Sequence, residues 1–117
     1  MKKKYSGSCH CGAVAFECEA DLENGTSKCN CSVCRKGRYW IVLVPEAGFR
    51  LLRGEEALTD YQFGGKMIHH LFCSRCGIKT FGRARLDVEF LGEKLEGMYY
   101  AVNVAALDDA TEEELAA

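Results

Sequence analysis

Two short cysteine motifs decide how this chain folds: Cys9-His10-Cys11-Gly12 near its start, and Cys73-Ser74-Arg75-Cys76-Gly77 in its second half. In an extended segment, residues i and i+2 lie on the same face, so Cys9 and Cys11 can reach one metal ion together. The second motif predicts a turn that curls both sulfurs inward, with Gly77 in the left-handed conformation. Paired, the two motifs predict a zinc site of four thiolates that joins the N-terminal segment to a late hairpin.

A third cluster, Cys29-Asn30-Cys31-Ser32-Val33-Cys34, contributes three more cysteines. Four thiolates close a tetrahedral zinc site, whereas three leave one coordination position for a substrate. Iron–sulfur ligation is disfavoured because the Cys-x-Cys pairs do not follow its common spacings. We therefore expect two zinc ions per chain, a structural zinc on Cys9, Cys11, Cys73 and Cys76, and a catalytic zinc on Cys29, Cys31 and Cys34.

Alternatives stay open for the middle cluster. Cys18 shares a strand face with Val14 and Phe16, which predicts a buried thiol, but its recruitment as a fourth ligand would close the second site. A redox-active pair of Cys31 and Cys34 is less favoured, because that motif normally opens a helix in a βαβ setting. Disulfide bonds are a further alternative, and a reducing compartment disfavours them.

The residues around the clusters give weaker signals. His10 lies between two expected ligands and should point away from their metal. His69 and His70 are adjacent in an expected strand, so at most one faces inward, either packed or as a proton shuttle. Three further pairs of residues are candidates near the open site. Asn30 and Ser32 would donate hydrogen bonds to sulfur, and Arg35 and Lys36 would attract a carboxylate. Tyr39 and Trp40 would line a pocket.

The bulk properties narrow the class of protein. A chain of 117 residues is expected to form a single domain over residues 1–117. A net charge of −2 does not favour a nucleic-acid partner, and no segment is apolar enough to span a membrane. Lys2-Lys3-Lys4 precedes the polar Tyr5-Ser6-Gly7-Ser8 where a signal peptide has an apolar run, so we expect a cytoplasmic protein.

Short strand-like runs separated by turn residues predict a mostly β fold, an all-β sandwich or a folded sheet. The helix-like segment is Thr111 to Ala116, with acidic residues in its first turn. The expected strands cover residues 13–18, 39–44, 49–53, 58–63, 67–72, 79–85 and 98–104.

The chain resembles the glutathione-dependent formaldehyde-activating family, which includes centromere-protein-V-like proteins. The resemblance is carried by the segments 7–14, 29–35 and 72–77, and by the tail Tyr99-Tyr100-Ala101-Val102-Asn103-Val104 with Leu107-Asp108. It implies an Mss4-like β-tent of short antiparallel strands stapled by zinc. It also implies the same division of the seven cysteines into a structural and a catalytic site.

The namesake activity of that family is a carbon–sulfur lyase reaction that joins glutathione to formaldehyde. The resemblance therefore implies a zinc enzyme that acts on adducts of a small thiol with formaldehyde or another small carbonyl compound. Its partners would be small molecules, a thiol and an aldehyde. The namesake enzymes are longer, and no glutathione contact carries over residue by residue. The competing hypothesis is a zinc-stabilised binding module without turnover, since a fold alone does not fix a function.

Overall fold

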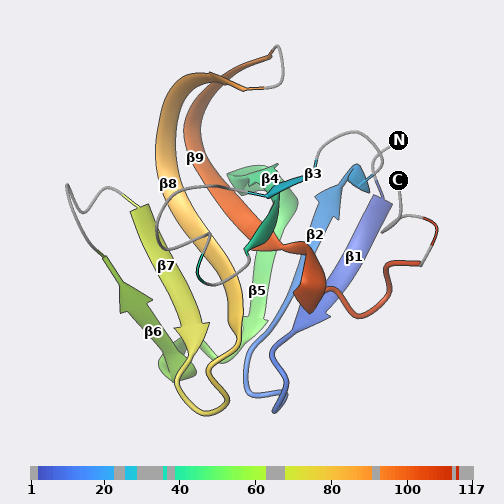
Figure 1. Cartoon of the computed structure of the whole chain (residues 1–117), viewed down its shortest axis with the longest axis vertical. Coiled ribbons are helices and arrows are strands. Elements are labelled where there is room, and N and C mark those ends of the chain that lie inside the picture. Colours follow the sequence, from blue (N-terminus) through green and yellow to red (C-terminus); the bar gives the residue numbers. More distant parts are fainter. Residues whose placement is uncertain are drawn as a thin grey trace.

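The computed structural model describes residues 3–22, 26–28, 36, 39–62, 68–90, 93–111 and 113. Within this part of the chain, nine strands form two antiparallel sheets (Figure 1). The three-stranded sheet has the order β1 (Lys3–Ser8), β2 (Ala15–Ala20), β5 (Phe49–Arg53). The six-stranded sheet has the order β3 (Thr26–Lys28), β4 (Trp40–Pro45), β9 (Glu93–Asn103), β8 (Lys79–Phe90), β7 (Ile68–Cys73), β6 (Leu58–Tyr61).

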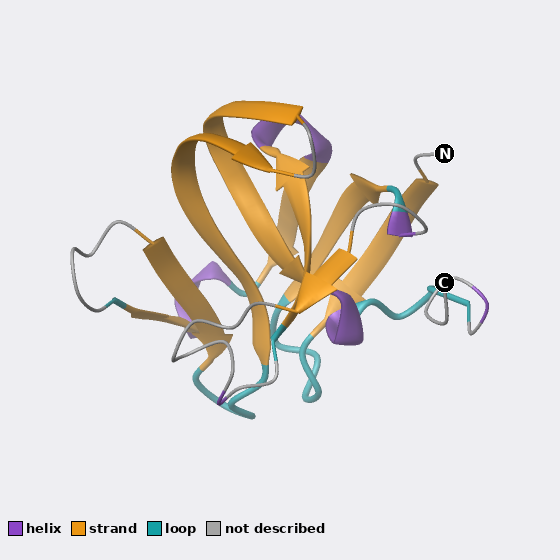
Figure 2. Ribbon diagram, turned by 45° about the horizontal axis from the view of Figure 1, so that its top comes forward, coloured by secondary structure: helices purple, strands orange, loops and turns teal. Residues whose placement is uncertain are grey.

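Three 3-10 turns complete the described elements, and they connect or follow strands (Figure 2). They are η1 (Glu46–Gly48), η2 (Glu55–Ala57) and η3 (Val104–Ala106). Of the helix expected over residues 111–116, only Thr111 and Glu113 belong to the described residues, so that prediction lies outside them. No helix in the described part of the chain is long and apolar enough to cross a membrane.

The two sheets enclose one aromatic and aliphatic core. Phe49 of β5 stacks on Tyr100 of β9, with ring centroids 4.1 Å apart and planes 7° apart. Phe81 of β8 lies edge-on to Phe16 of β2 at 6.0 Å. Offset and edge-to-face pairs of this kind add to the stabilisation that burial gives. The remaining buried members come from both sheets and include Tyr5, Cys18, Val42, Val44, Leu71 and Val102.

The predicted strands are present, but most of them begin or end at other residues than predicted. The run 49–53 matches β5, and six other expected runs overlap β2, β4, β6, β7, β8 and β9. The sequence pattern missed β1, whose Lys3 and Lys4 are exposed, and the three-residue β3. It also stopped β8 at residue 85 and started β9 at residue 98, whereas their ladder continues from Arg85↔Met98 to Phe90↔Glu93.

The outer edge of β1 is covered by the segment that follows η3. Gly7 forms an isolated antiparallel bridge with Leu107. The Asp108 amide donates to the Ser6 carbonyl at 2.8 Å, and the Ser6 amide donates to an Asp109 carboxylate oxygen at 2.9 Å. This segment therefore satisfies backbone groups that an edge strand would otherwise present to solvent.

Gly54 has a structural role that no other residue type can fill. Its φ is +94°, it precedes η2, and its carbonyl accepts a hydrogen bond from the Ala57 amide at 2.9 Å. A Cβ atom at this position would lie 2.2 Å from the Ala13 carbonyl oxygen. The close approach holds the turn before β6 against the segment that leads into β2.

We predict that Gly54→Ala lowers the free energy of unfolding by about 3 kcal/mol, since the left-handed conformation and the overlap both add cost. Gly97→Ala is the matched control, because Gly97 has φ +105° but its Cβ would meet no described atom within 4 Å. The control should lose about 1 kcal/mol. Chemical denaturation of the two variants measures both losses, and equal losses would contradict the overlap.

Candidate metal centre

The first half of the centre is the turn between β1 and β2. The Cys9 amide donates to the Val14 carbonyl at 3.1 Å, and the Val14 amide donates to the Cys9 sulfur at 3.3 Å. Gly12 takes φ +82°, which lets the chain reverse within a few residues. The side chain of Arg53 donates to the Gly12 carbonyl at 3.0 Å and fixes the turn to β5. Cys9 and Cys11 therefore project from a turn whose backbone is held from both sides.

The second half is the turn between β7 and β8. The Gly77 amide donates to the Cys73 carbonyl at 2.8 Å, and the Cys73 amide donates to the Ile78 carbonyl at 3.0 Å. Gly77 has φ +78°, as the motif predicted. The Arg75 amide lies 3.4 Å from the Cys73 sulfur, so this turn presents N–H groups toward a sulfur as well as curling the chain.

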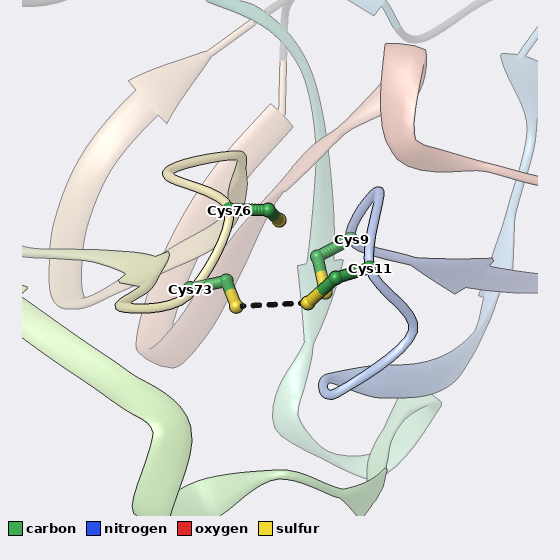
Figure 3. Close-up of side chains that lie close together, drawn as sticks. All are labelled: Cys9, Cys11, Cys73 and Cys76. Carbon is green, nitrogen blue, oxygen red and sulfur yellow. Dashed lines mark hydrogen bonds between the residues drawn. The ribbon is translucent and has the colours of Figure 1, made fainter.

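The two turns bring the four sulfurs together although Cys11 and Cys73 are 62 positions apart in the sequence (Figure 3). All four sulfurs lie within 4.8 Å of one another. Cys9 Sγ is 3.6 Å from Cys11 Sγ, which is 3.7 Å from Cys73 Sγ. A tetrahedral site with Zn–S bonds of about 2.3 Å needs sulfurs about 3.8 Å apart. The cluster therefore has the size and donor set of a four-thiolate zinc site, and all five described cysteines are free thiols.

The centre is buried on one side and open on the other. Cys9 and Cys73 are buried, and they pack with Val14 and Ala57 in a small hydrophobic cluster. Cys11 is exposed and Cys76 is intermediate. A site built this way is anchored in the protein interior, while its outer sulfurs remain close to solvent.

The thiols of the centre titrate unequally. Backbone N–H groups of Cys11 and then Ile78 lower the pKa of Cys76 to about 6. The pKa of Cys11 is raised to about 11, because desolvation and the neighbouring sulfurs outweigh the Ala13 amide, which lowers it. Four sulfurs this close cannot all carry negative charge unless a cation compensates them. The donor set therefore favours a divalent metal ion.

Comparison with known proteins shows the family of this chain. The family model for glutathione-dependent formaldehyde-activating enzymes matches residues 4–116. The chain belongs to this family. The formaldehyde-activating family resemblance seen in the cysteine motifs is thereby confirmed, and it extends over nearly the whole chain.

Two relatives show how far the similarity reaches. A Halomonas elongata protein, provisionally named a glutathione-dependent formaldehyde-activating enzyme, is 37% identical over an alignment of 78 residues, and the match covers 60% of this chain and 50% of that protein. The chain thus matches about half the length of this curated relative. A crystal structure of a Rhodobacter sphaeroides protein, a structural genomics target, is 34% identical with a TM-score of 0.75, covering 96% of this chain and 95% of the other.

The middle cysteine cluster lies outside the described residues. Cys29, Cys31 and Cys34, with Asn30, Ser32 and Arg35, belong to this undescribed part, so the open site stays a prediction. Cys18 is described: it is 2% exposed and belongs to the main hydrophobic core, as its strand parity predicted. Burial, and then Asp109, raise the pKa of the Cys18 thiol to about 12, which keeps it protonated.

The histidines divide as their positions predicted. His10 is exposed between the two cysteines of its turn. His69 and His70 face opposite sides of β7: the side chain of His69 is 32% exposed and its Nδ1 lies 2.6 Å from an Asp60 oxygen, while His70 is 5% exposed. Of the two aromatic candidates, Tyr39 is buried and Trp40 packs partly buried against the core.

Sequence reasoning missed one residue near these groups, Lys79. Its Nζ atom lies 3.0 Å from His70 Nδ1 and 3.9 Å from the centroid of the Tyr39 ring. His70 and Lys79 meet because β7 and β8 form a hairpin, whereas Tyr39 directly precedes β4 and is distant from both in the sequence. The signal that could have found the contact is the hairpin register. Lys79 at the start of β8 is the strand partner of Phe72, which is two residues from His70 on β7.

We predict that Cys76→Ser removes one zinc equivalent and leaves the chain unfolded or aggregated, because structural zinc supplies much of the folding free energy of such small folds. Cys18→Ala is the matched control: it also removes a thiol, but one in the hydrophobic core. The control should keep its full zinc content and lose only about 1 kcal/mol. Metal analysis and circular dichroism measure both, and a fully stable Cys76→Ser protein would contradict a structural role.

Proposed function

We propose that this protein is a zinc-dependent enzyme of the carbon–sulfur lyase type, which joins a small thiol to formaldehyde or another small carbonyl compound and cleaves the adduct in reverse. The observation that carries the proposal is the family match over residues 4–116. Glutathione is the thiol that the family description names. Because the chain matches only half of its curated relative, we propose the thiol and the carbonyl compound as classes.

We further propose that the two zinc ions have different tasks. The sulfur distances of 3.6 and 3.7 Å support a closed structural site on Cys9, Cys11, Cys73 and Cys76. The remaining cluster, Cys29, Cys31 and Cys34, would hold the catalytic zinc. Cys18 is packed in the hydrophobic core with a raised pKa, which supports a second site of three thiolates without a fourth cysteine.

The reaction needs an ionised thiol next to an electrophilic carbon. A zinc ion bound at the three-cysteine site would favour loss of the thiol proton, since metal coordination deprotonates thiols. The sulfur then adds to the carbonyl carbon, and the carbonyl oxygen must gain a proton. Holding both reactants at one place can supply a large part of the acceleration. Lys36 is exposed beside this cluster in the sequence, and Arg35 precedes it; either would attract a substrate carboxylate.

The register of β3 and β4 supports a single location for this chemistry. Lys28 is the strand partner of Trp40, so the connection that carries the three cysteines leaves and rejoins the six-stranded sheet at one point. Cys29 follows Lys28 directly in the sequence. We therefore propose that the reaction takes place near the end of this sheet at which β3 ends and β4 begins.

We predict that Cys31→Ser lowers the zinc content from two to one per chain while the protein stays folded. The expected cause is loss of a ligand from a site that does not hold the sheets together. Metal analysis with thermal unfolding checks this, and loss of both zinc ions would show that the two sites are not independent.

We expect the purified protein with two zinc ions to accelerate adduct formation between glutathione and formaldehyde, and Cys29→Ala to lose at least about 100-fold of that rate, because the reactants are no longer held at one centre. Exchange NMR of the thiol adduct measures the rate against the uncatalysed reaction. A zinc-replete protein that catalyses neither this adduct nor those of other small thiols and aldehydes would favour the binding module.

A further inference from the structure

A groove opens on the inner face of the six-stranded sheet, beside the three-stranded sheet. The six-stranded sheet is the wider of the two, and its strands β6 and β7 extend to the left of β5 in Figure 1. The groove has a volume of about 260 Å³, whereas pockets for drug-sized ligands begin at roughly 300 Å³. Its size therefore suits a smaller organic molecule, and no cysteine is among its lining residues.

The floor and walls of the groove are apolar and largely aromatic. Leu71 of β7 and Phe81 of β8 are its buried lining residues and form the floor. The stacked rings of Phe49 and Tyr100 form part of the wall, and both side chains are only partly buried. Apolar surface of this kind gains free energy when a ligand displaces the water on it. The groove therefore favours a ligand with an apolar body.

The strand register places opposite charges at two sides of this floor. Asp60 of β6 is the strand partner of Leu71, and Leu71 is the partner of Phe81. Arg83 lies two residues beyond Phe81 on β8, so its side chain shares their face. Asp60 and Arg83 are both exposed and both line the groove. From the spacing of strands and residues in a sheet, their Cα atoms are on the order of 12 Å apart.

The Asp60 carboxylate is held through one oxygen and accessible through the other. His69 Nδ1 donates to Oδ2 at 2.6 Å, and Gln62 Nε2 donates to the same oxygen at 3.3 Å. No other described residue contacts this carboxylate, so Oδ1 is left as an acceptor for a ligand. Glu55, in the turn η2 just before β6, adds a second carboxylate to this side. Two carboxylates together favour a ligand ammonium group.

Arg83 supplies the complementary cation at the other side of the groove. Within the described part of the chain, its guanidinium group forms no ion pair and no hydrogen bond. A guanidinium presents its donors in a planar fork that matches the two oxygens of a carboxylate. The groove therefore offers a site for an anionic group, a site for a cationic group, and an apolar surface between them.

We propose that this groove binds a zwitterionic dipeptide with an apolar side chain. The free carboxylate pairs with Arg83, the free ammonium group pairs with Asp60 and Glu55, and the apolar side chain lies against Phe49 and Tyr100. This would be a second function beside the proposed one, because it needs neither zinc nor a cysteine.

The separation of the charges selects the length of the ligand. An extended dipeptide spans about 7 Å, which the inward-reaching side chains of Asp60 and Arg83 complement across their Cα separation. A single amino acid carries both charges on one carbon and cannot reach both sides. Glutathione carries a second carboxylate and no apolar side chain, so it matches these walls less well.

Titration of the purified protein with leucylglycine tests the site, with amide chemical shifts in NMR as the readout. The shifts should concentrate at Leu71 and Phe81 and give a Kd on the order of 1 mM, as expected for a ligand of this size. N-acetyl-leucylglycine and leucylglycinamide each lack one charge, and each should bind about tenfold more weakly through loss of hydrogen bonds between charged groups. Equal binding of either blocked form overturns the charge pairing. Absence of shifts at about twenty times the expected Kd overturns the site.

Three variants assign the charges. Arg83→Gln should weaken leucylglycine binding about tenfold and leave that of leucylglycinamide unchanged, because the amide has no carboxylate to lose. Asp60→Asn should weaken it by a smaller factor, because Glu55 is still present, and leave N-acetyl-leucylglycine unchanged. Arg85→Gln is the matched control, since Arg85 is exposed on the same strand but does not line the groove. Equal weakening by Arg83→Gln and Arg85→Gln would reveal a response to net charge and overturn the proposal.

Discussion

Four sulfur atoms converge at one point between the ends of two hairpins, and most of the architecture depends on that convergence. One pair comes from the β1–β2 turn of the three-stranded sheet and the other from the β7–β8 turn of the six-stranded sheet. Bringing together residues 62 positions apart costs chain entropy that a small core only partly repays. Like charges on close sulfurs oppose the arrangement further, so a cation is the natural counterpart of this geometry.

The fold and the first centre could be predicted because each depends on short-range patterns. A Cys-x-Cys pair in an extended segment and a Cys-x-x-Cys turn with a following glycine both set side-chain directions within a few residues, and Gly77 adopts the left-handed conformation that the motif requires. Alternation placed Cys18 in the core for the same reason. The sequence pattern missed β1, because its Lys3 and Lys4 are both exposed and interrupt the alternation of buried and exposed residues.

What the sequence could not supply was the meeting of residues across strands. His70, Lys79 and Tyr39 form contacts that depend on the β7–β8 register and on the bulge between Leu71 and Phe72. A shift of one residue would turn His70 toward the hydrophobic core and His69 away from it. The two adjacent histidines thus acquire different chemistry, one paired with a carboxylate near solvent and one with an ammonium in the interior.

The segment after η3 has a consequence for the behaviour of the protein at high concentration. Its contacts with Ser6, Gly7 and Ser8 occupy the open side of β1. An uncovered strand of that kind is a template on which a second molecule can add its own strand. Residues 107–109 therefore oppose self-association. A chain shortened before Leu107 would expose an unpaired strand edge and would be prone to forming dimers or fibrils.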